Sequence, residues 1–100
     1  MPNTYFSFKQ FTIYQDRCAM KVTTDGCLFG SWCANEIYKL IHSQVYLLDI
    51  GAGTGLLSLM IAQKNKCVID AIEIDKEAAM QAIENISASP WNKKIYVVNE

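Results

Sequence analysis

The residues of this chain with the clearest potential for chemistry are three alternating glycines flanked by two acids. Gly51, Gly53 and Gly55 follow an apolar run that carries Asp49, and Glu73 lies eighteen residues after the last glycine. An apolar run, a break at alternating glycines and a second apolar run predict a strand, a tight turn and a helix, which is where α/β sheets bind nucleotides. Glycine suits such a turn because it adopts backbone angles that side chains resist and lets a ligand approach bare backbone.

The order of residues in this loop separates three classes of nucleotide site. A phosphate-binding P-loop ends in Gly-Lys-Ser/Thr, whereas Gly55 is followed by Leu56, so that class is excluded. The dinucleotide fingerprint needs a small residue where Leu56 stands, which leaves an NAD-dependent oxidoreductase only as an alternative. Asp49 would repel a pyrophosphate and attract a cation, and S-adenosylmethionine carries an ammonium and a sulfonium. The loop thus resembles the first motif of the Rossmann-like class I methyltransferases, with these residues at the methyl donor: Asp49, Gly51, Ala52, Gly53 and Gly55.

The second acid, Glu73, is expected near the end of a strand over residues 67–74. Its separation from the glycines is the one that places a carboxylate over a ribose, where its two oxygens can accept from both hydroxyls. Ile74 would pack either on the adenine face or in the core. Asp75 directly precedes a helical stretch, and we expect it to cap the N-terminus of that helix.

Parallel strands and helices must hold these residues in place. We expect strands over residues 45–50, 67–74 and 95–98, a helix after the glycines, and another after Asp75 whose apolar face carries Ala79, Ala82, Ile83 and Ile86. Right-handed crossovers between the strands then give the spatial order 3-2-1.

A small strand and helix segment is expected upstream of that sheet. Residues 5–22 alternate aromatic and polar side chains in part, which indicates short strands with an irregularity near Lys9-Gln10. Thr24 or Asp25 is expected to cap a short helix over residues 28–33, and a second helical stretch covers residues 36–41.

Length and composition agree with one α/β domain over residues 1–100. The chain is 51% hydrophobic and 19% charged, and its net charge of −1 gives no global sign of a nucleic-acid partner. No membrane span or export signal is expected. The cysteines form no C-x-x-C pair and are interpreted as small buried residues of a cytoplasmic protein, so no metal site is predicted: Cys18, Cys27, Cys33 and Cys67.

Several blocks outside the glycine loop resemble the bacterial tRNA1(Val) adenine-N6 methyltransferases. The most specific are Asp16-Arg17-Cys18-Ala19-Met20-Lys21-Val22 and Thr24-Asp25-Gly26, preceded by Phe8-Lys9-Gln10-Phe11. Glu84-Asn85-Ile86 and Ala88-Ser89-Pro90-Trp91 are similar to the same family, so the resemblance runs from Phe6 onward. Thr23 departs from it, because the family tends to have glycine before Thr24-Asp25.

The resemblance implies transfer of a methyl group from S-adenosylmethionine to N6 of the adenine 3′ of the anticodon in valine tRNA. Lys21, Thr24 and Asp25 would cover the methionine end of the donor, although Asp25 could equally be a helix cap. The family's Asn-Pro-Pro-aromatic motif, which holds the adenine, is absent from this chain and is expected beyond Glu100. No catalytic residue is therefore expected within the chain.

The sequence is thus interpreted as the N-terminal half of a methyltransferase sheet, holding the donor site without the acceptor site. A non-catalytic cofactor-binding module stays open as an alternative. The strand over residues 45–50 would lie at the centre of the complete sheet, and its unpaired apolar edge predicts weak stability or self-association of the isolated chain.

Overall fold

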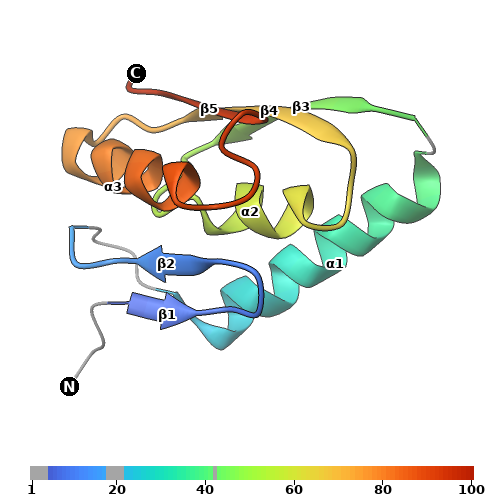
Figure 1. Ribbon diagram of the computed structural model, residues 1–100, viewed down its shortest axis with the longest axis horizontal. Helices are drawn as coiled ribbons and strands as arrows, with labels where there is room; N and C mark the ends of the chain where they lie inside the picture. The colour runs from blue at the N-terminus through green and yellow to red at the C-terminus, as the bar shows by residue number, and fades with distance from the viewer. Residues whose placement is uncertain (1–4, 18–21, 42) are drawn as a thin grey trace.

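The computed structural model describes residues 5–17, 22–41 and 43–100, and its centre is a parallel three-stranded sheet (Figure 1). The middle strand pairs with both of its neighbours in register, so that Leu48, Asp70 and Tyr96 lie side by side across it. The strands are β3 (Val45–Ile50), β4 (Cys67–Ile72) and β5 (Ile95–Val98), with β4 in the middle.

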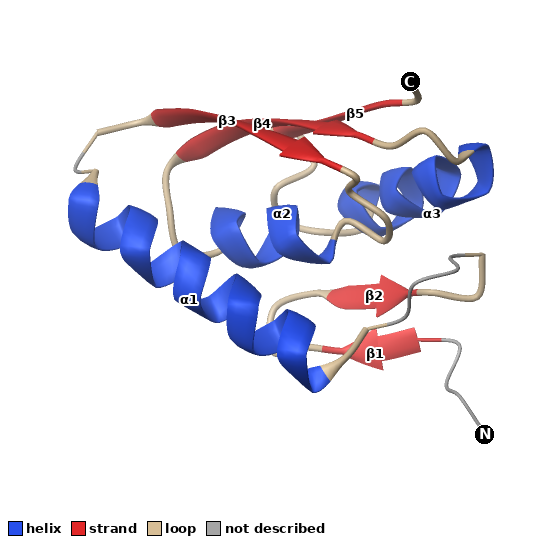
Figure 2. Cartoon of the chain, turned by 180° about the vertical axis from the view of Figure 1, so that it is seen from behind, coloured by secondary structure: helices blue, strands red, loops and turns tan. Residues whose placement is uncertain are grey.

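The helices form a second layer on one side of this sheet, and a two-stranded hairpin forms a third (Figure 2). The helices are α1 (Thr24–Leu40), α2 (Leu56–Ala62) and α3 (Lys76–Ser87). The hairpin consists of β1 (Tyr5–Ser7) and β2 (Thr12–Tyr14), which pair antiparallel, and it contacts α3. The short strands and their break near Lys9-Gln10 agree with the sequence prediction.

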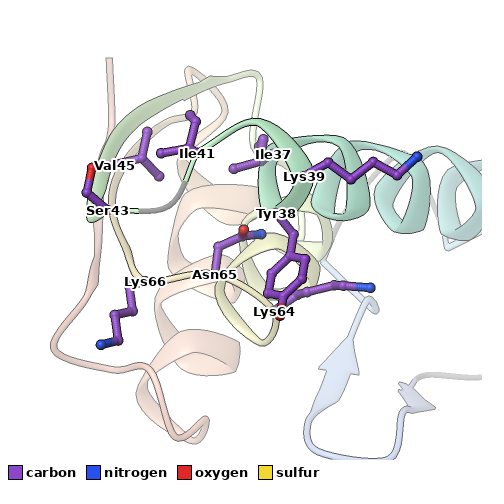
Figure 3. A pocket seen from close by; sticks show the side chains of 9 residues that line it. All are labelled: Ile37, Tyr38, Lys39, Ile41, Ser43, Val45, Lys64, Asn65 and Lys66. Atoms are coloured by element: carbon purple, nitrogen blue, oxygen red, sulfur yellow. The ribbon is translucent and has the colours of Figure 1, made fainter.

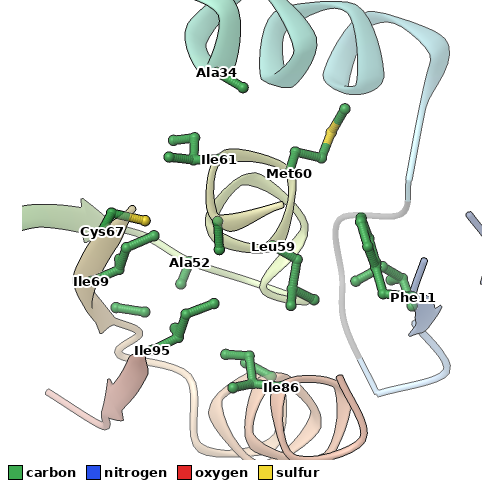
Figure 4. Packing of buried hydrophobic residues seen from close by; sticks show 14 residues of the cluster. Phe11, Ala34, Ala52, Leu59, Met60, Ile61, Cys67, Ile69, Ile86 and Ile95 are labelled. Atoms are coloured by element: carbon green, nitrogen blue, oxygen red, sulfur yellow. The ribbon is translucent and has the colours of Figure 1, made fainter. Parts of the chain in front are cut away.

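The hydrophobic core fills the space between the sheet and the helices (Figure 4). Leu59 of α2 and Ile69 of β4 are almost wholly buried at its centre, and Ile86 of α3 and Ile95 of β5 close it from the other side. Helix α1 packs on α2, where a Cβ on Gly30 would collide with the Met60 side chain. Phe11 meets Trp91 edge to face at 5.9 Å and attaches the hairpin to the same core.

Helix α1 differs from the sequence prediction, because one continuous helix replaces the two short ones. Its N-cap is Thr23, whose hydroxyl accepts from the Gly26 N–H at 3.0 Å, so the prediction of Thr24 or Asp25 as the cap is wrong. Thr23 is the residue that replaces the glycine usual in the resembled family. Asp25 lies in the first turn, where a negative charge interacts favourably with the helix dipole.

The structure also differs from two smaller predictions. Strand β4 ends at Ile72, so Glu73 and Ile74 follow the strand rather than belonging to it. On α3, Ala79, Ala82 and Ile86 are buried as expected, whereas Ile83 is exposed. Asp75 caps α3 as predicted, since its carboxylate accepts from the Ala78 N–H at 2.9 Å.

The face of the sheet away from the helices is open in the part of the chain that the structure describes (Figure 1). Along β3, Tyr46, Leu48 and Ile50 are 77%, 61% and 75% exposed, while the alternate residues turn toward the helices. Parallel sheets are normally covered on both faces. An exposed apolar sheet face like this one is usually covered by further helices or by another chain.

Candidate functional site

The glycine loop, residues 51–55, follows β3 at the carboxyl end of the sheet. Gly51, Gly53 and Gly55 all have positive φ, at 76°, 56° and 89°, a region that favours glycine over residues with side chains. The N–H groups of Gly51 and Ala52 both donate to the Ile72 carbonyl, at 2.8 and 3.0 Å, which fixes the loop to the end of β4. A Cβ on Gly51 or Gly53 would meet nothing within 4 Å, so bare backbone faces open space there.

Glu73 holds this loop from the neighbouring strand end. Its side chain is buried, with one oxygen accepting from the Gly53 N–H at 2.7 Å and the other from the Asp75 N–H at 2.9 Å. The carboxylate therefore connects the glycine loop to the start of α3. Because each carboxylate oxygen has a further lone pair, both can still accept from a ligand hydroxyl.

Asp49 lies two residues before the glycine loop, on the helix-facing side of β3. Its Oδ2 accepts from the Ser58 hydroxyl at 2.7 Å, and Ser58 is fully buried in α2. Burial raises the pKa of the Asp49 carboxyl, the Ser58 hydrogen bond lowers it, and the charge of Glu73 raises it, with a net shift upward. A nearby cation would stabilise the ionised carboxylate and so oppose this upward shift, which means that the pair of acids suits a positively charged ligand.

The remaining predicted site residues lie outside the glycine loop itself. Ile74 is 83% exposed, so it lies outside the core of the described residues and its side chain is available to a ligand. Thr24 and Asp25 are exposed in the first turn of α1. A Cβ on Gly26 would lie 3.8 Å from the Leu56 side chain, so this turn lies beside the start of α2. Lys21 is outside the described residues.

Sequence reasoning missed three polar residues that hold the site together. Ser58 binds Asp49, Asn85 donates to the Thr54 carbonyl at 2.8 Å, and Asn99 donates to the carbonyls of Glu73 and Ile74 at 2.8 and 3.1 Å. Ser58 and Asn85 each interrupt the buried side of a helix, and a buried polar residue needs a partner. That pattern was the available signal for two of them. Asn99 has no comparable signal, because it follows the last strand.

A hollow of about 540 Å³ lies at the opposite end of the sheet (Figure 3). Val45, the first residue of β3, lines it together with Ile37 and Ile41 near the end of α1, and Lys64 and Lys66 from the segment after α2. Since β3 is six residues long, this hollow lies roughly 16–20 Å from the glycine loop. None of the acids or glycines of the motif reaches it.

Within the described ranges, no group of three or more His, Cys, Asp or Glu side chains is placed to hold a metal ion. Cys67 is buried and Cys27 and Cys33 are half-buried, all three as free thiols, while Cys18 is outside those ranges. No helix there is long and apolar enough to cross a membrane.

Comparison with known protein families shows which family the chain belongs to. A family model described as "Ribosomal protein L11 methyltransferase (PrmA)" matches residues 21–100. The chain belongs to this methyltransferase family. The match includes the glycine loop, both acids and all three parallel strands, but it starts after the N-terminal hairpin.

A relative from Phocaeicola vulgatus matches nearly all of this methyltransferase chain, including most of the hairpin region. It is named tRNA1(Val) (adenine(37)-N6)-methyltransferase and is 55% identical over 97 residues, which are 97% of the chain and 39% of the relative. The resemblance stated from the sequence is therefore confirmed. The chain spans about two-fifths of the length of that relative.

Solved structures agree on the α/β fold. The SAM-dependent methyltransferase from Agrobacterium tumefaciens matches with a TM-score of 0.76 and 17% identity, over 94% of this chain and 31% of the other. The TrmK protein of M. capricolum, solved with S-adenosylhomocysteine, matches with a TM-score of 0.57 and 23% identity, over 69% of this chain and 31% of the other.

Proposed function

We propose that the chain binds S-adenosylmethionine at the glycine loop and forms the donor-binding part of a longer tRNA1(Val) adenine-N6 methyltransferase. The single observation that carries this proposal is the 55% identity, over all but three residues of the chain, to a relative with that name. The open backbone at Gly51 and Gly53, between two carboxylates, supports the proposal independently.

Each site residue has a role in this proposal. Asp49 faces the cationic methionine end of the donor, with Lys21, Thr24 and Asp25 covering that end from the segment before α1 and its first turn. Glu73 accepts from the ribose hydroxyls through lone pairs that the Gly53 and Asp75 amides leave free. Ile74 packs on the adenine, and the backbone of Gly51, Ala52, Gly53 and Gly55 lines the donor.

In the proposed reaction, the N6 lone pair of the target adenine attacks the donor methyl carbon. A carbon–nitrogen bond forms, the carbon–sulfur bond breaks with its electron pair going to sulfur, and the methylated N6 releases a proton to water. Catalysis of such a transfer depends on holding donor and acceptor in line. This chain supplies the donor side, and the acceptor side belongs to an Asn-Pro-Pro-aromatic motif beyond Glu100.

The family model and the tRNA-modifying relative suggest different substrates, and the N-terminal hairpin favours tRNA. The model described for ribosomal protein L11 matches only from residue 21, whereas the tRNA methyltransferase relative matches 97% of the chain. Since that second match excludes only three residues, it must include most of the hairpin, residues 5–14. Cytoplasmic tRNA is accordingly the proposed partner.

The open side of the sheet fits a half-domain. In the complete enzyme, further strands add beside β3, with β3, β4 and β5 forming the 3-2-1 half of the sheet, and further helices cover the face that carries Tyr46 and Leu48. Without them, β3 offers an unpaired edge through which the isolated chain self-associates.

Methyl transfer from tritiated S-adenosylmethionine tests the proposal. The complete enzyme should label unmodified valine tRNA at N6 of adenine 37 and leave ribosomal protein L11 unlabelled. The 100-residue chain alone should transfer nothing at saturating donor. Labelling of L11 but not tRNA would overturn the substrate assignment, and turnover by the chain alone would overturn the division between donor and acceptor sites.

A further inference from the structure

The side chain of Asn85 joins three segments that are far apart in the sequence. It lies in α3 and is 1% exposed. Its Oδ1 accepts from the Tyr14 N–H at 2.8 Å, and its Nδ2 donates to the Tyr14 carbonyl at 2.9 Å and to the Thr54 carbonyl at 2.8 Å. Both amide hydrogens and the oxygen are thus used, as a buried carboxamide requires.

On one side, Asn85 fixes the glycine loop. Thr54 stands between Gly53 and Gly55, and its carbonyl points to Asn85 while the Gly53 N–H points to Glu73. A Cβ on Gly55 would lie 3.5 Å from Ile86 and 3.7 Å from Ala82, so the loop rests directly on α3. Asn85 therefore holds the loop from beneath, on the side away from the open space at Gly51 and Gly53.

On the other side, Asn85 holds the N-terminal hairpin. Tyr14 is the last residue of β2, and Asn85 satisfies both of its backbone groups as a neighbouring strand would. A two-stranded hairpin is marginally stable alone, so attachments of this kind decide whether it stays in place.

Gln81, one turn earlier on α3, holds the residues that directly follow the hairpin. Its Oε1 accepts from the Arg17 N–H and its Nε2 donates to Asp16, both at 2.7 Å. Gln81 is as deeply buried as Asn85, at 1% exposed. Asn85 bonds to both the hairpin and the loop, whereas Gln81 bonds to residues 16 and 17, which makes Gln81 a matched control.

We propose that Asn85 is a positioning residue that couples the N-terminal hairpin to the donor loop, so that each is held more firmly when the other is in place. The inference rests on the proposed donor site. Because linkage is reciprocal, a ligand that fixes the loop must also strengthen the attachment of Tyr14.

Hydrogen exchange of the Tyr14 amide in the complete enzyme, with and without saturating S-adenosylhomocysteine, tests this coupling. In the wild type, exchange at Tyr14 should slow at least threefold on binding. In the Asn85→Ala variant, binding should no longer slow exchange at Tyr14, and the affinity for S-adenosylhomocysteine should fall about tenfold. In Gln81→Ala the amide should exchange faster overall but keep its threefold response, with affinity within about twofold of wild type.

Three results would overturn the coupling. They are a wild type that binds S-adenosylhomocysteine by calorimetry without slower Tyr14 exchange, an Asn85→Ala variant that keeps the response, or a Gln81→Ala variant that loses it equally. The first needs no variant and so does not depend on Asn85→Ala folding. A wild type that does not bind S-adenosylhomocysteine at all would instead overturn the proposed function.

Discussion

The two ends of the parallel sheet differ in how their polar groups are held. At the carboxyl end, backbone N–H groups and buried hydroxyl and amide groups fix Glu73, Asp49 and the Thr54 carbonyl in place. At the amino end, the hollow of about 540 Å³ has exposed lysines and apolar walls, and Lys64 donates to the half-buried Asn35 side chain. The Asn65 amide in its lining donates to the carbonyls of Ala34 and Ile61, and among the described residues no buried acid and no open glycine backbone faces this hollow. A binding site is marked here by oriented polar groups beside open backbone rather than by volume.

The largest expected effect is that of Glu73→Ala. It removes the acceptor of the Gly53 and Asp75 amides and the proposed acceptor for the ribose, so donor affinity should fall by roughly 1.5–3 kcal/mol, the cost of losing hydrogen bonds to a charged group. Calorimetry with S-adenosylhomocysteine on the complete enzyme measures it. An affinity equal to wild type would reduce Glu73 to a structural link between the loop and α3.

Asp49→Asn should separate affinity from stability. Since burial raises the pKa of Asp49, its ionised form lowers the stability of the fold once the pH exceeds the ordinary pKa of an aspartic acid. The amide keeps an acceptor for Ser58 and removes that charge. At neutral pH the variant should unfold at the same or a higher denaturant concentration, while donor affinity falls by about tenfold, equivalent to ~1.4 kcal/mol. A parallel loss of stability and affinity would contradict this account.

Much of this site was predictable because its residues are close in sequence. The strands at residues 45–50 and 95–98, the glycine loop and the Asp75 cap follow from local patterns, and the structure has all of them. The continuous helix α1 was not predictable in this way. Ala34 is buried against α2 and the Asn35 side chain accepts from Lys64, so tertiary contacts carry the helix through the point where the pattern predicted a break.

The side-chain partners inside the site were also beyond local patterns. The position of Glu73 could be predicted, but its burial and its bond to Gly53 could not, because they depend on where β4 ends relative to the loop. The link from Asn85 to Tyr14 spans 71 residues and requires the hairpin to lie on α3. Sequence spacing fixes which residues share an element, whereas packing between elements decides what their polar atoms meet.

Ser58→Ala should have a smaller effect that depends on pH. If Asp49 faces the cationic end of the donor as proposed, binding needs its ionised form, so affinity is complete above the pKa of that carboxyl and is lost as the pH falls through it. The Ser58 hydrogen bond lowers this pKa, so the variant should lose affinity at a higher pH than wild type and match it within about twofold in alkaline solution.

The control for this change is Ser89→Ala, which removes another buried hydroxyl that donates to the Ile86 carbonyl, away from Asp49. Its affinity profile should follow wild type at every pH. Identical profiles for all three proteins would mean that Asp49 does not face the cationic part of the donor.

The smallest effect is expected at the amino end of the sheet. Lys64→Ala and Lys66→Ala, alone or together, should change donor affinity by less than about twofold, because both residues lie roughly 16–20 Å from the glycine loop. Calorimetry measures the donor affinity of these lysine variants, and the Glu73→Ala variant measured in parallel provides the comparison. A tenfold loss from either lysine variant would move the site to the other end of the sheet.

The central claim is that the glycine loop between Asp49 and Glu73 binds a cationic methyl donor and not a dinucleotide. Isothermal titration calorimetry of the complete enzyme with S-adenosylmethionine, with S-adenosylhomocysteine and with NAD tests it most directly. The account predicts saturable binding of S-adenosylmethionine and S-adenosylhomocysteine, at least tenfold weaker in the Glu73→Ala variant, and no saturation by NAD. Tighter binding of NAD than of either S-adenosyl compound would contradict it.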